Sequence, residues 1–396
     1  MTSAPLAHGT GSGSQHAPRI RKVALFIPVL SAGGAERVFL HLAGGFAEQG
    51  LDVDLVLVRR AGPLLEHVPA RVRIVDLQSS RLLFSVRALV RYLREARPAV
   101  LLSAMEDINT VALCARRLAR VETRVVATVH NTISLEAQRA TSLKVRVAPL
   151  LARRFYPWAD AVVAVSHGAA EDLVELGVTS DRLSVIYNPV VTPGLFEQAS
   201  RPIDDPWFSP GAPPVVLSAG RLAPQKDFGT LIRAFERLRR QRTARLLILG
   251  EGGERPALEH LVQELDLEEH VRLPGYVDNP FARMARAALF VLSSRHEGLP
   301  TALIEAMAVG TPVVSTDCRS GPAEILERGA YGELVGVGDV AGLAQAMSRT
   351  LAVPTDGARL RRRADEFSLE RSVAAYRELF DTLLGFAPEA KRHEAP

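Results

Sequence analysis

Residues 287–312 read AALFVLSSRHEGLPTALIEAMAVGTP, and this stretch decides the fold of the second half of the chain. The apolar run 287–292 predicts a buried strand, and residues 301–309 predict a helix. Glu297 therefore follows the carboxyl end of a strand, and Glu305 lies one turn inside the next helix. Open α/β sheets bind ligands at this edge, so both carboxylates can face one ligand. Two glutamates at this spacing can also be solvated surface residues, and the rest of the chain decides between the two interpretations.

A basic pair follows an earlier predicted strand, residues 215–220. Arg221 comes directly after this strand, and Lys226 precedes a helix predicted from residue 228 to about 240. Arg presents a planar fork of donors and Lys a mobile point charge, as expected where a diphosphate is held without a metal. The two can equally be members of the 48 basic residues on an ordinary turn. The order G-R-x4-K, then E-x7-E, within one α/β unit favours a shared site.

These motifs resemble those of the retaining glycosyltransferases of family 4, and the resemblance extends over about residues 19–384. It implies the GT-B architecture, in which two Rossmann-like domains face each other and the last helix crosses back to the first domain. It implies that Arg221 and Lys226 hold the diphosphate of a nucleoside diphosphate sugar. Glu305 would hold the ribose hydroxyls, and Glu297 the hydroxyls of the transferred sugar. Backbone N–H groups and a helix N-terminus for the phosphates would come from Gly298, Leu299, Pro300 and Thr301.

Strand and helix patterns alternate along the chain, which predicts parallel sheets with crossover helices. The strands predicted in the first half are residues 23–29, 53–58, 73–76, 100–103, 125–128, 161–165 and 183–186. Those predicted in the second half are residues 215–219, 245–249, 271–273, 288–292 and 313–315. Seven prolines between residues 189 and 214 predict an extended linker without a further element.

These patterns divide the chain into domains. We expect an acceptor-binding domain over residues 19–195, a linker over 196–213 and a nucleotide-sugar-binding domain over 214–367. A helix over residues 368–386, with Ser368 as its N-cap, would cross back to the first domain. Residues 1–18 and 387–396 are expected to be disordered tails.

Polar residues also follow strands of the predicted first domain. Gly33 and Gly34 open a helix, where they allow close approach to a donor or acceptor and leave N–H groups free, with a tight turn as the alternative. His130 and Asn131 follow another strand, where the imidazole can donate to a sugar hydroxyl or phosphate and take part in proton transfer. A helix-capping or solvated pair is the alternative. Ser166 either contacts the acceptor or caps the next helix.

No metal site or cofactor is predicted, since the nucleotide sugar is a co-substrate. Asp52 and Asp54 form a D-x-D, the metal-binding signature of the other glycosyltransferase architecture. They stand at the beginning of a strand, so we expect them on a solvated face. The charges of Arg221 and Lys226 would replace a metal in stabilising the leaving group.

Composition places the chain among globular proteins, with 396 residues of which 47% are hydrophobic. Cys114 and Cys318 are too few for a disulfide framework and too far apart for a zinc motif, which favours a reducing cytoplasm. Residues 1–18 lack the apolar core of a signal peptide, and no apolar run of 18 residues occurs.

Residues 81–154 carry 14 basic and 5 acidic residues, a net charge of +9. An apolar stripe in this region comprises Leu82, Leu83, Val86, Leu89, Val90 and Leu93, and the basic residues near it are Arg81, Arg87, Arg91, Arg94, Arg139, Lys144, Arg146, Arg153 and Arg154. The stripe can be the buried face of a crossover helix. The basic residues favour docking of the first domain on an anionic membrane, which predicts peripheral attachment to the inner face of the cell membrane. Nucleic acid is not predicted as a partner, because neither an aromatic strand platform nor a recognition helix is present.

A narrower resemblance comes from residues 33–38 (GGAERV), 186–190 (IYNPV) and 315–326 (STDCRSGPAEIL). These resemble bacterial N-acetylgalactosaminyl transferases that extend glycans linked to polyprenyl diphosphate. The predicted function is retaining transfer of a hexose or N-acetylhexosamine, with a UDP-sugar favoured as donor, to a glycan or lipid-linked acceptor in cell-surface polysaccharide biosynthesis. The alternatives are a sugar-nucleotide epimerase of the same architecture and a non-catalytic membrane-surface binding protein.

Overall fold

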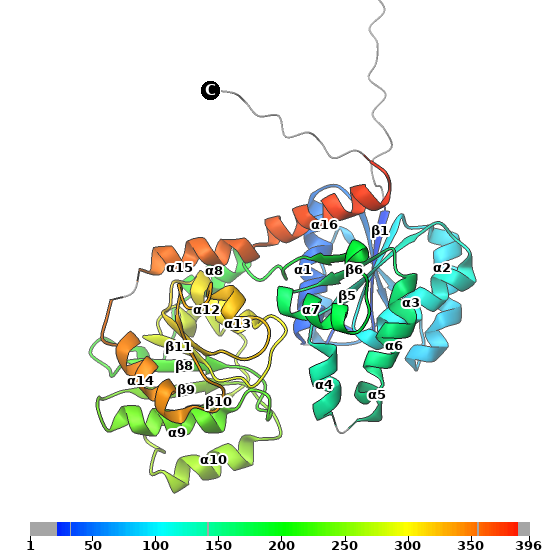
Figure 1. The fold of residues 1–396 in the computed structure, drawn as a ribbon. Helices are drawn as coiled ribbons and strands as arrows, with labels where there is room; N and C mark the ends of the chain where they lie inside the picture. Colours follow the sequence, from blue (N-terminus) through cyan, green and yellow to red (C-terminus); the bar gives the residue numbers. More distant parts are fainter. Residues whose placement is uncertain (1–21, 32, 141, 355, 387–396) are drawn as a thin grey trace, which may run out of the picture.

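The computed structural model describes residues 22–31, 33–140, 142–354 and 356–386. Figure 1 shows two α/β lobes side by side, with the chain returning from the second lobe to the first through its last helix. The first lobe contains a seven-stranded parallel sheet of order β3-β2-β1-β4-β5-β6-β7, and the second a six-stranded sheet of order β10-β9-β8-β11-β12-β13. The two Rossmann-like domains expected from the sequence are confirmed.

The strands agree closely with the predicted ones. The first sheet comprises β1 (Lys22–Ile27), β2 (Asp52–Leu57), β3 (Val72–Asp76), β4 (Val100–Ala104), β5 (Arg124–Val129), β6 (Ala161–Ala164) and β7 (Leu183–Val185). The second comprises β8 (Val215–Ala219), β9 (Arg245–Leu249), β10 (Val271–Gly275), β11 (Leu289–Leu292), β12 (Val313–Thr316) and β13 (Glu333–Val335). All twelve predicted strands are present. Strand β13 was missed because it is a three-residue edge strand that is only partly buried, which leaves no apolar run to detect.

Helices cover both faces of each sheet (Figure 1). Those of the first domain are α1 (Gly34–Glu48), α2 (Ser85–Ala96), α3 (Glu106–Ala119), α4 (Ile133–Arg139), α5 (Leu143–Arg146), α6 (Ala148–Phe155) and α7 (His167–Glu175). The second domain and the connections contain α8 (Pro193–Ser200), α9 (Phe228–Arg239), α10 (Arg255–Glu264), α11 (Phe281–Met284), α12 (Thr301–Ala308), α13 (Pro322–Ile325), α14 (Val340–Thr350), α15 (Gly357–Ala364) and α16 (Leu369–Leu383).

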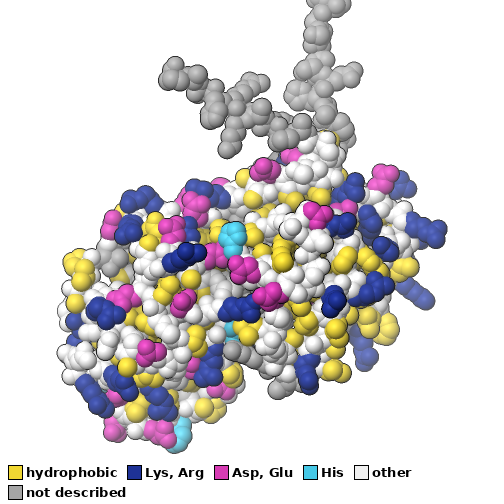
Figure 2. Space-filling model, viewed as in Figure 1, with side chains coloured by type: hydrophobic (Ala, Val, Ile, Leu, Met, Phe, Trp, Pro, Cys, Tyr) yellow, Lys and Arg dark blue, Asp and Glu magenta, His cyan; other side chains and the backbone are white. Residues whose placement is uncertain are grey.

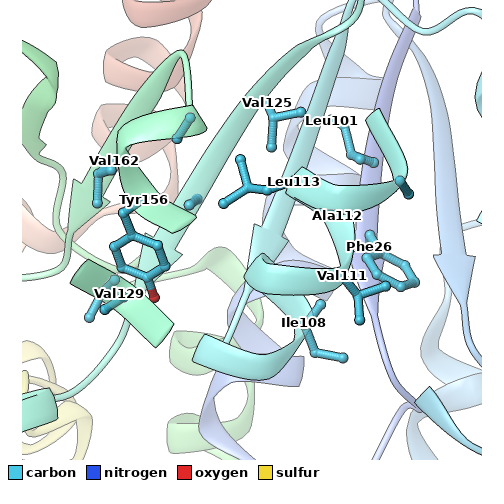
Figure 3. Packing of buried hydrophobic residues seen from close by; sticks show 14 of the residues in the cluster. Phe26, Leu101, Ile108, Val111, Ala112, Leu113, Val125, Val129, Tyr156 and Val162 are labelled. Carbon is cyan, nitrogen blue, oxygen red and sulfur yellow. The ribbon is translucent and has the colours of Figure 1, made fainter. Parts of the chain in front are cut away.

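Each sheet is buried on both faces because its parallel strands carry apolar side chains on both sides. On one face of the first sheet, Phe26 lies beside Ile108 and Val111 of α3, and Tyr156 lies beside Val129 and Val162 (Figure 3). Burial of each large apolar side chain contributes about 1.5–3 kcal/mol. This packing on both faces holds the strands of each sheet in place, and with them the starting points of the loops that follow the strands.

Helix α16 packs on the first domain, as predicted. Phe46 of α1 contacts Phe380 with ring centroids 5.5 Å apart, and it meets Tyr376 edge-on. The two helices approach so closely that a Cβ on Gly45 would lie 2.6 Å from a methyl group of Val373. Ser368 occupies the predicted N-cap position, but its side chain makes no capping bond.

The expectation of a linker without a further element is wrong, because residues 193–200 form helix α8. Pro193 stands in the first turn, where its missing N–H costs nothing. The Thr192 hydroxyl caps this helix by accepting from the Leu195 N–H at 3.3 Å. Leu195 is buried in the core of the second domain. Proline density therefore marked a helix start and not only an extended segment.

Asp54 does not lie on a solvated face, which corrects a second expectation. Asp52 is exposed, but the Asp54 side chain is buried and accepts hydrogen bonds from Arg73 and from the Tyr92 hydroxyl at 2.7 Å each. Burial alone would raise the pKa of Asp54, and these bonds outweigh it, so the pKa lies below the ordinary value. Asp54 is a structural carboxylate inside the first domain.

Candidate active site

The two charged motifs of the second domain are joined by hydrogen bonds between their loops. Strands β8 and β11 are neighbours, so the loops that follow them emerge side by side. The Ser293 hydroxyl donates to the Lys226 carbonyl at 2.7 Å, and the Arg295 N–H donates to the Gln225 carbonyl at 2.8 Å. The Gln225 amide donates back to the His296 carbonyl at 2.9 Å. The turn that carries Lys226 therefore has a fixed position relative to Glu297.

Lys226 and Glu297 form a direct ion pair, with Nζ and Oε1 2.6 Å apart. The Ser294 hydroxyl donates to the same carboxylate oxygen at 2.6 Å. Glu297 is 7% exposed, so the pair is shielded from water and gains more from its electrostatic attraction than a surface pair does. The structure thus brings together two residues that the sequence analysis assigned to adjacent parts of one ligand.

Arg221 extends from a turn that is held by close backbone packing. A Cβ on Gly250 would lie 1.9 Å from the Gly220 carbonyl oxygen, and one on Gly252 would lie 2.2 Å from the Leu222 carbonyl oxygen. Only glycine fits at these two positions without displacing the turn. Arg221 itself is exposed, and its charge acts on Glu136 of the first domain. Arg221 is therefore close enough to the first domain for its charge to act on a carboxyl there.

Glu305 faces a cavity of about 820 Å³ between the two domains. From here on we call it the cleft cavity, and its lining includes Gly34, Arg37, Tyr276, Thr301 and Glu305. Burial raises the pKa of Glu305 to about 7, while the positive charges of Arg37 and Lys226 act in the opposite direction. Thr301 is the first residue of α12, whose N-terminal N–H groups favour an anion. One helix therefore presents both an anion-binding end and a carboxylate to the same cavity.

The first domain touches the loop that carries Glu297. The Thr132 hydroxyl donates to the Glu297 carbonyl at 3.3 Å, and the Ser166 hydroxyl donates to the Gly298 carbonyl at 2.9 Å. A Cβ on Gly298 would lie 2.1 Å from the His130 carbonyl oxygen, so a larger residue would force the domains apart. The candidate site is thus assembled from both domains.

His130 lies where the sequence predicted, but its protonation differs from the expectation. Its Nε2 is 3.0 Å from the Thr128 hydroxyl. Burial lowers the pKa of His130 to about 4, although a hydrogen bond with Asn188 opposes the shift. The imidazole is therefore neutral near pH 7 and does not titrate there. Asn131 is half-buried, and it lies beside Gly298.

Ser166 caps helix α7, which was one of its two predicted roles. Its hydroxyl oxygen accepts from the Ala169 N–H at 3.2 Å, and the side chain is fully buried. An acceptor contact by Ser166 stays a prediction. Gly33 is the N-cap residue of α1, and Gly34 lines the cleft cavity. Close approach to a ligand is therefore open to Gly34, whose added Cβ would meet no atom within 4 Å.

Two charged residues near the candidate site were not assigned from the sequence: Arg37, which lines the cleft cavity, and Glu136, on whose carboxyl the charges of Arg221 and Glu297 act. Burial raises the pKa of Glu136 to about 7, with the negative charge of Glu106 acting in the same direction. Arg37 could have been predicted as a site residue, because it belongs to the GGAERV segment used for the narrower resemblance. No sequence pattern indicated Glu136.

In the described part of the chain, no three or more His, Cys, Asp or Glu side chains are grouped so as to hold a metal ion. None of the helices there has the length and hydrophobicity needed to span a bilayer.

Two facing Rossmann-like domains with charged motifs at their shared cleft are the architecture of the GT-B glycosyltransferases. Comparison with family profiles agrees. The profile "Glycosyltransferase Family 4" matches residues 32–192, and the profile "Glycosyl transferases group 1" matches residues 200–367. The chain belongs to this family of two-domain glycosyltransferases.

Individual relatives come from bacterial glycan synthesis. The chain is 34% identical over 232 residues to the N-acetylgalactosamine-N,N'-diacetylbacillosaminyl-diphospho-undecaprenol 4-alpha-N-acetylgalactosaminyltransferase of Campylobacter jejuni, a match that covers 58% of this chain and 60% of that relative. It is 29% identical over 364 residues to the lipopolysaccharide core biosynthesis glycosyltransferase LpsE of Rhizobium meliloti, a match that covers 88% of this chain and 95% of that relative. The solved structure of HepE from Anabaena in complex with UDP and glucose superposes with a TM-score of 0.73 at 22% identity, covering 91% of this chain and 100% of that one. This last likeness supports the fold.

Proposed function

We propose that the protein is a retaining glycosyltransferase that transfers a hexose or N-acetylhexosamine from a UDP-sugar to a polyprenyl-diphosphate-linked glycan in cell-surface polysaccharide synthesis. The observation that carries the proposal is the ion pair of Lys226 and Glu297, with Nζ and Oε1 2.6 Å apart, whose lysine also acts electrostatically on Glu305 of the cleft cavity. The Campylobacter relative acts on a lipid-linked glycan by its name, and the Anabaena structure contains UDP, which together support these substrate classes.

The arrangement suits front-face displacement without a metal. Arg221 and Lys226 bind the diphosphate and stabilise the charge that develops on it as the glycosidic bond breaks. The departing diphosphate oxygen accepts the proton of the attacking acceptor hydroxyl. Glu297 orients the sugar hydroxyls, and Glu305 binds the ribose. Thr132 and Ser166 of the first domain bind the carbonyls of Glu297 and Gly298, which holds the loop of Glu297 against the first domain.

A thermal-shift panel of UDP-, GDP- and ADP-sugars tests the donor class, followed by NMR analysis of the anomeric configuration of the product. We expect stabilisation by a UDP-sugar, retention of configuration, and turnover in excess EDTA. Loss of activity on chelation, restored by Mn²⁺, would refute metal independence. Release of free UDP and sugar that is unaffected by an acceptor would favour the epimerase alternative.

The protonation of Glu305 predicts a pH dependence of donor binding. With a pKa of about 7, Glu305 is mostly protonated at about pH 6 and mostly ionised at about pH 8. An ionised carboxylate accepts ribose hydroxyls more strongly than a neutral carboxyl does. We expect the KM for the donor to fall as the pH rises through this range, and Glu305→Gln to raise KM and remove the dependence. A KM with the same pH profile in both proteins would rule out this role for Glu305.

An exposed apolar and basic surface on the first domain supports membrane docking. We call it the α2–α6 surface, and its exposed apolar side chains are Leu83, Phe84, Leu118, Leu143 and Leu150. Exposed basic side chains on the same elements are Arg87, Arg91, Arg94, Arg117, Arg146, Arg153 and Arg154. Figure 2 shows hydrophobic and basic side chains intermingled on this side of the molecule.

Only part of the predicted apolar stripe is exposed in the structure. Leu89 and Leu93 are buried in the core, so the crossover-helix alternative holds for that face of α2. Leu83 and Phe84, in the short 3-10 helix η2 (Leu82–Phe84), are exposed. Apolar anchors with surrounding arginines fit an anionic membrane, where each basic residue contributes about 1 kcal/mol.

Sedimentation with liposomes tests this docking. We expect the full chain to bind anionic vesicles at low salt and to be released at high salt, whereas Leu83→Ser with Phe84→Ser reduces binding severalfold. Val353→Ser, at an exposed apolar residue of the second domain, is the matched control and should bind like the wild type. Equal binding to anionic and neutral vesicles, or none at low salt, would favour a soluble acceptor.

A further inference from the structure

Arg37 extends from the first domain and contacts the second. It lies in the first turn of α1, where its backbone N–H donates to the Gly33 carbonyl at 3.2 Å. One terminal nitrogen of its guanidinium donates to the Tyr276 hydroxyl at 3.0 Å. Tyr276 directly follows strand β10 of the second domain, and its side chain is largely exposed. The guanidinium therefore bridges the cleft, although a neutral phenol is its only partner at that distance in the described part of the chain.

One hydrogen-bond donor of the Arg37 guanidinium lacks an acceptor among the described residues. Its Nε atom is buried and has no hydrogen-bond partner among the described residues. Buried donors are normally paired, because an unpaired one keeps the full cost of leaving water. Arg37 also lines the cleft cavity, so a ligand there can reach the guanidinium.

Helices α12 and α1, on the two sides of the cleft cavity, each present their first turn and a charged side chain to it. On α12, Thr301 at the helix start is followed one turn later by Glu305. On α1, Gly34 at the helix start is followed one turn later by Arg37. All four residues line the cavity, so two helix N-termini, a carboxylate and a guanidinium surround the same space. Helix N-termini and a guanidinium attract an anion, whereas a carboxylate suits hydroxyl groups.

A nucleoside diphosphate carries both kinds of group, with phosphates next to ribose hydroxyls. We propose that Arg37 is a donor-binding residue, supplied by the first domain across the cleft, and that its guanidinium binds the diphosphate of the nucleotide. This inference rests on the proposed function, and it adds a third cation to Arg221 and Lys226. The guanidinium exchanges its bond with Tyr276 for charged bonds to phosphate oxygens, which are stronger.

The competing explanation is structural, with Arg37 serving only to position Tyr276. The two explanations differ in what each variant does. Tyr276→Phe removes the bond between the two side chains and keeps the guanidinium. Arg37→Met keeps the aliphatic stem and removes every donor, while Arg37→Lys keeps the charge without the planar fork. Arg237→Met, at an exposed arginine of α9, is the matched control.

Isothermal titration of the full chain with UDP and with uridine separates these roles. We expect Arg37→Met to weaken UDP binding by about tenfold or more, as loss of a charged hydrogen bond does, and to change uridine binding by less than about twofold. Arg37→Lys should give an intermediate loss for UDP. Tyr276→Phe should change UDP binding by less than about threefold, and Arg237→Met should have no effect. Thermal unfolding midpoints near that of the wild type show that each variant is folded.

Three other results of these titrations would contradict the inference. Equal losses for UDP and uridine that Tyr276→Phe reproduces would mean that Arg37 only positions the tyrosine. Unchanged UDP binding in both Arg37 variants would overturn the inference and leave the proposed function intact. Failure of the wild-type chain to bind UDP, GDP or ADP would overturn both.

Discussion

Lys226→Ala is expected to lower kcat/KM by about 10²–10³-fold or more, because in the proposed mechanism it removes a preorganised cation from the departing diphosphate. The ion pair with Glu297 adds a second effect, since the variant leaves a buried carboxylate without its cation. Arg221→Ala should also abolish most turnover, with less effect on stability because Arg221 is exposed. Steady-state kinetics and thermal unfolding of both variants check these expectations.

A double variant separates the catalytic effect from the structural one. Lys226→Ala with Glu297→Gln has no unpaired charge, so it should recover much of the lost stability and remain inactive. Arg240→Ala is the control, because its pair with Glu236 is an exposed i,i+4 pair of the kind that contributes little. Near-wild-type kcat/KM in both Lys226→Ala and Arg221→Ala would mean that these residues do not bind the diphosphate.

Most of the fold could be predicted because parallel strands buried on both faces are continuous apolar runs. Strand β4, whose five residues are all buried, is an example. The candidate site could be predicted for a related reason. Arg221 and Glu297 follow β8 and β11, which lie at the point where the strand order of the second sheet reverses, and ligands bind at such points.

Other features depend on contacts that sequence spacing does not contain. Asp54 is buried because Arg73 and Tyr92 are present to bind its carboxylate. His130 is neutral because packing around the ring lowers its pKa, although an exposed loop histidine would titrate near pH 6.5. The contact between Arg37 and Tyr276 joins residues of different domains, so only the assembled cleft reveals it.

Glu297→Gln is expected to lower kcat by about 10²-fold while leaving the affinity for UDP unchanged or slightly higher. The amide has nearly the same volume and can still accept the Ser294 hydrogen bond, so the loop should keep its position. The substitution removes the negative charge that pairs with Lys226, which leaves the ammonium group free for the diphosphate. In the proposed mechanism the hydroxyls of the transferred sugar lose a charged acceptor, and this loss affects the reaction with the UDP-sugar but not the binding of UDP.

Glu305→Gln is the matched comparison, since it changes the other carboxylate of the cleft in the same way. We expect it to weaken UDP and UDP-sugar alike, because ribose is common to both, with a smaller effect on kcat. Titration of each variant with UDP and single-turnover kinetics with the UDP-sugar measure the two quantities separately. If Glu297→Gln weakened UDP and Glu305→Gln did not, the roles of the two carboxylates would have to be exchanged, with Glu297 at the ribose and Glu305 at the sugar.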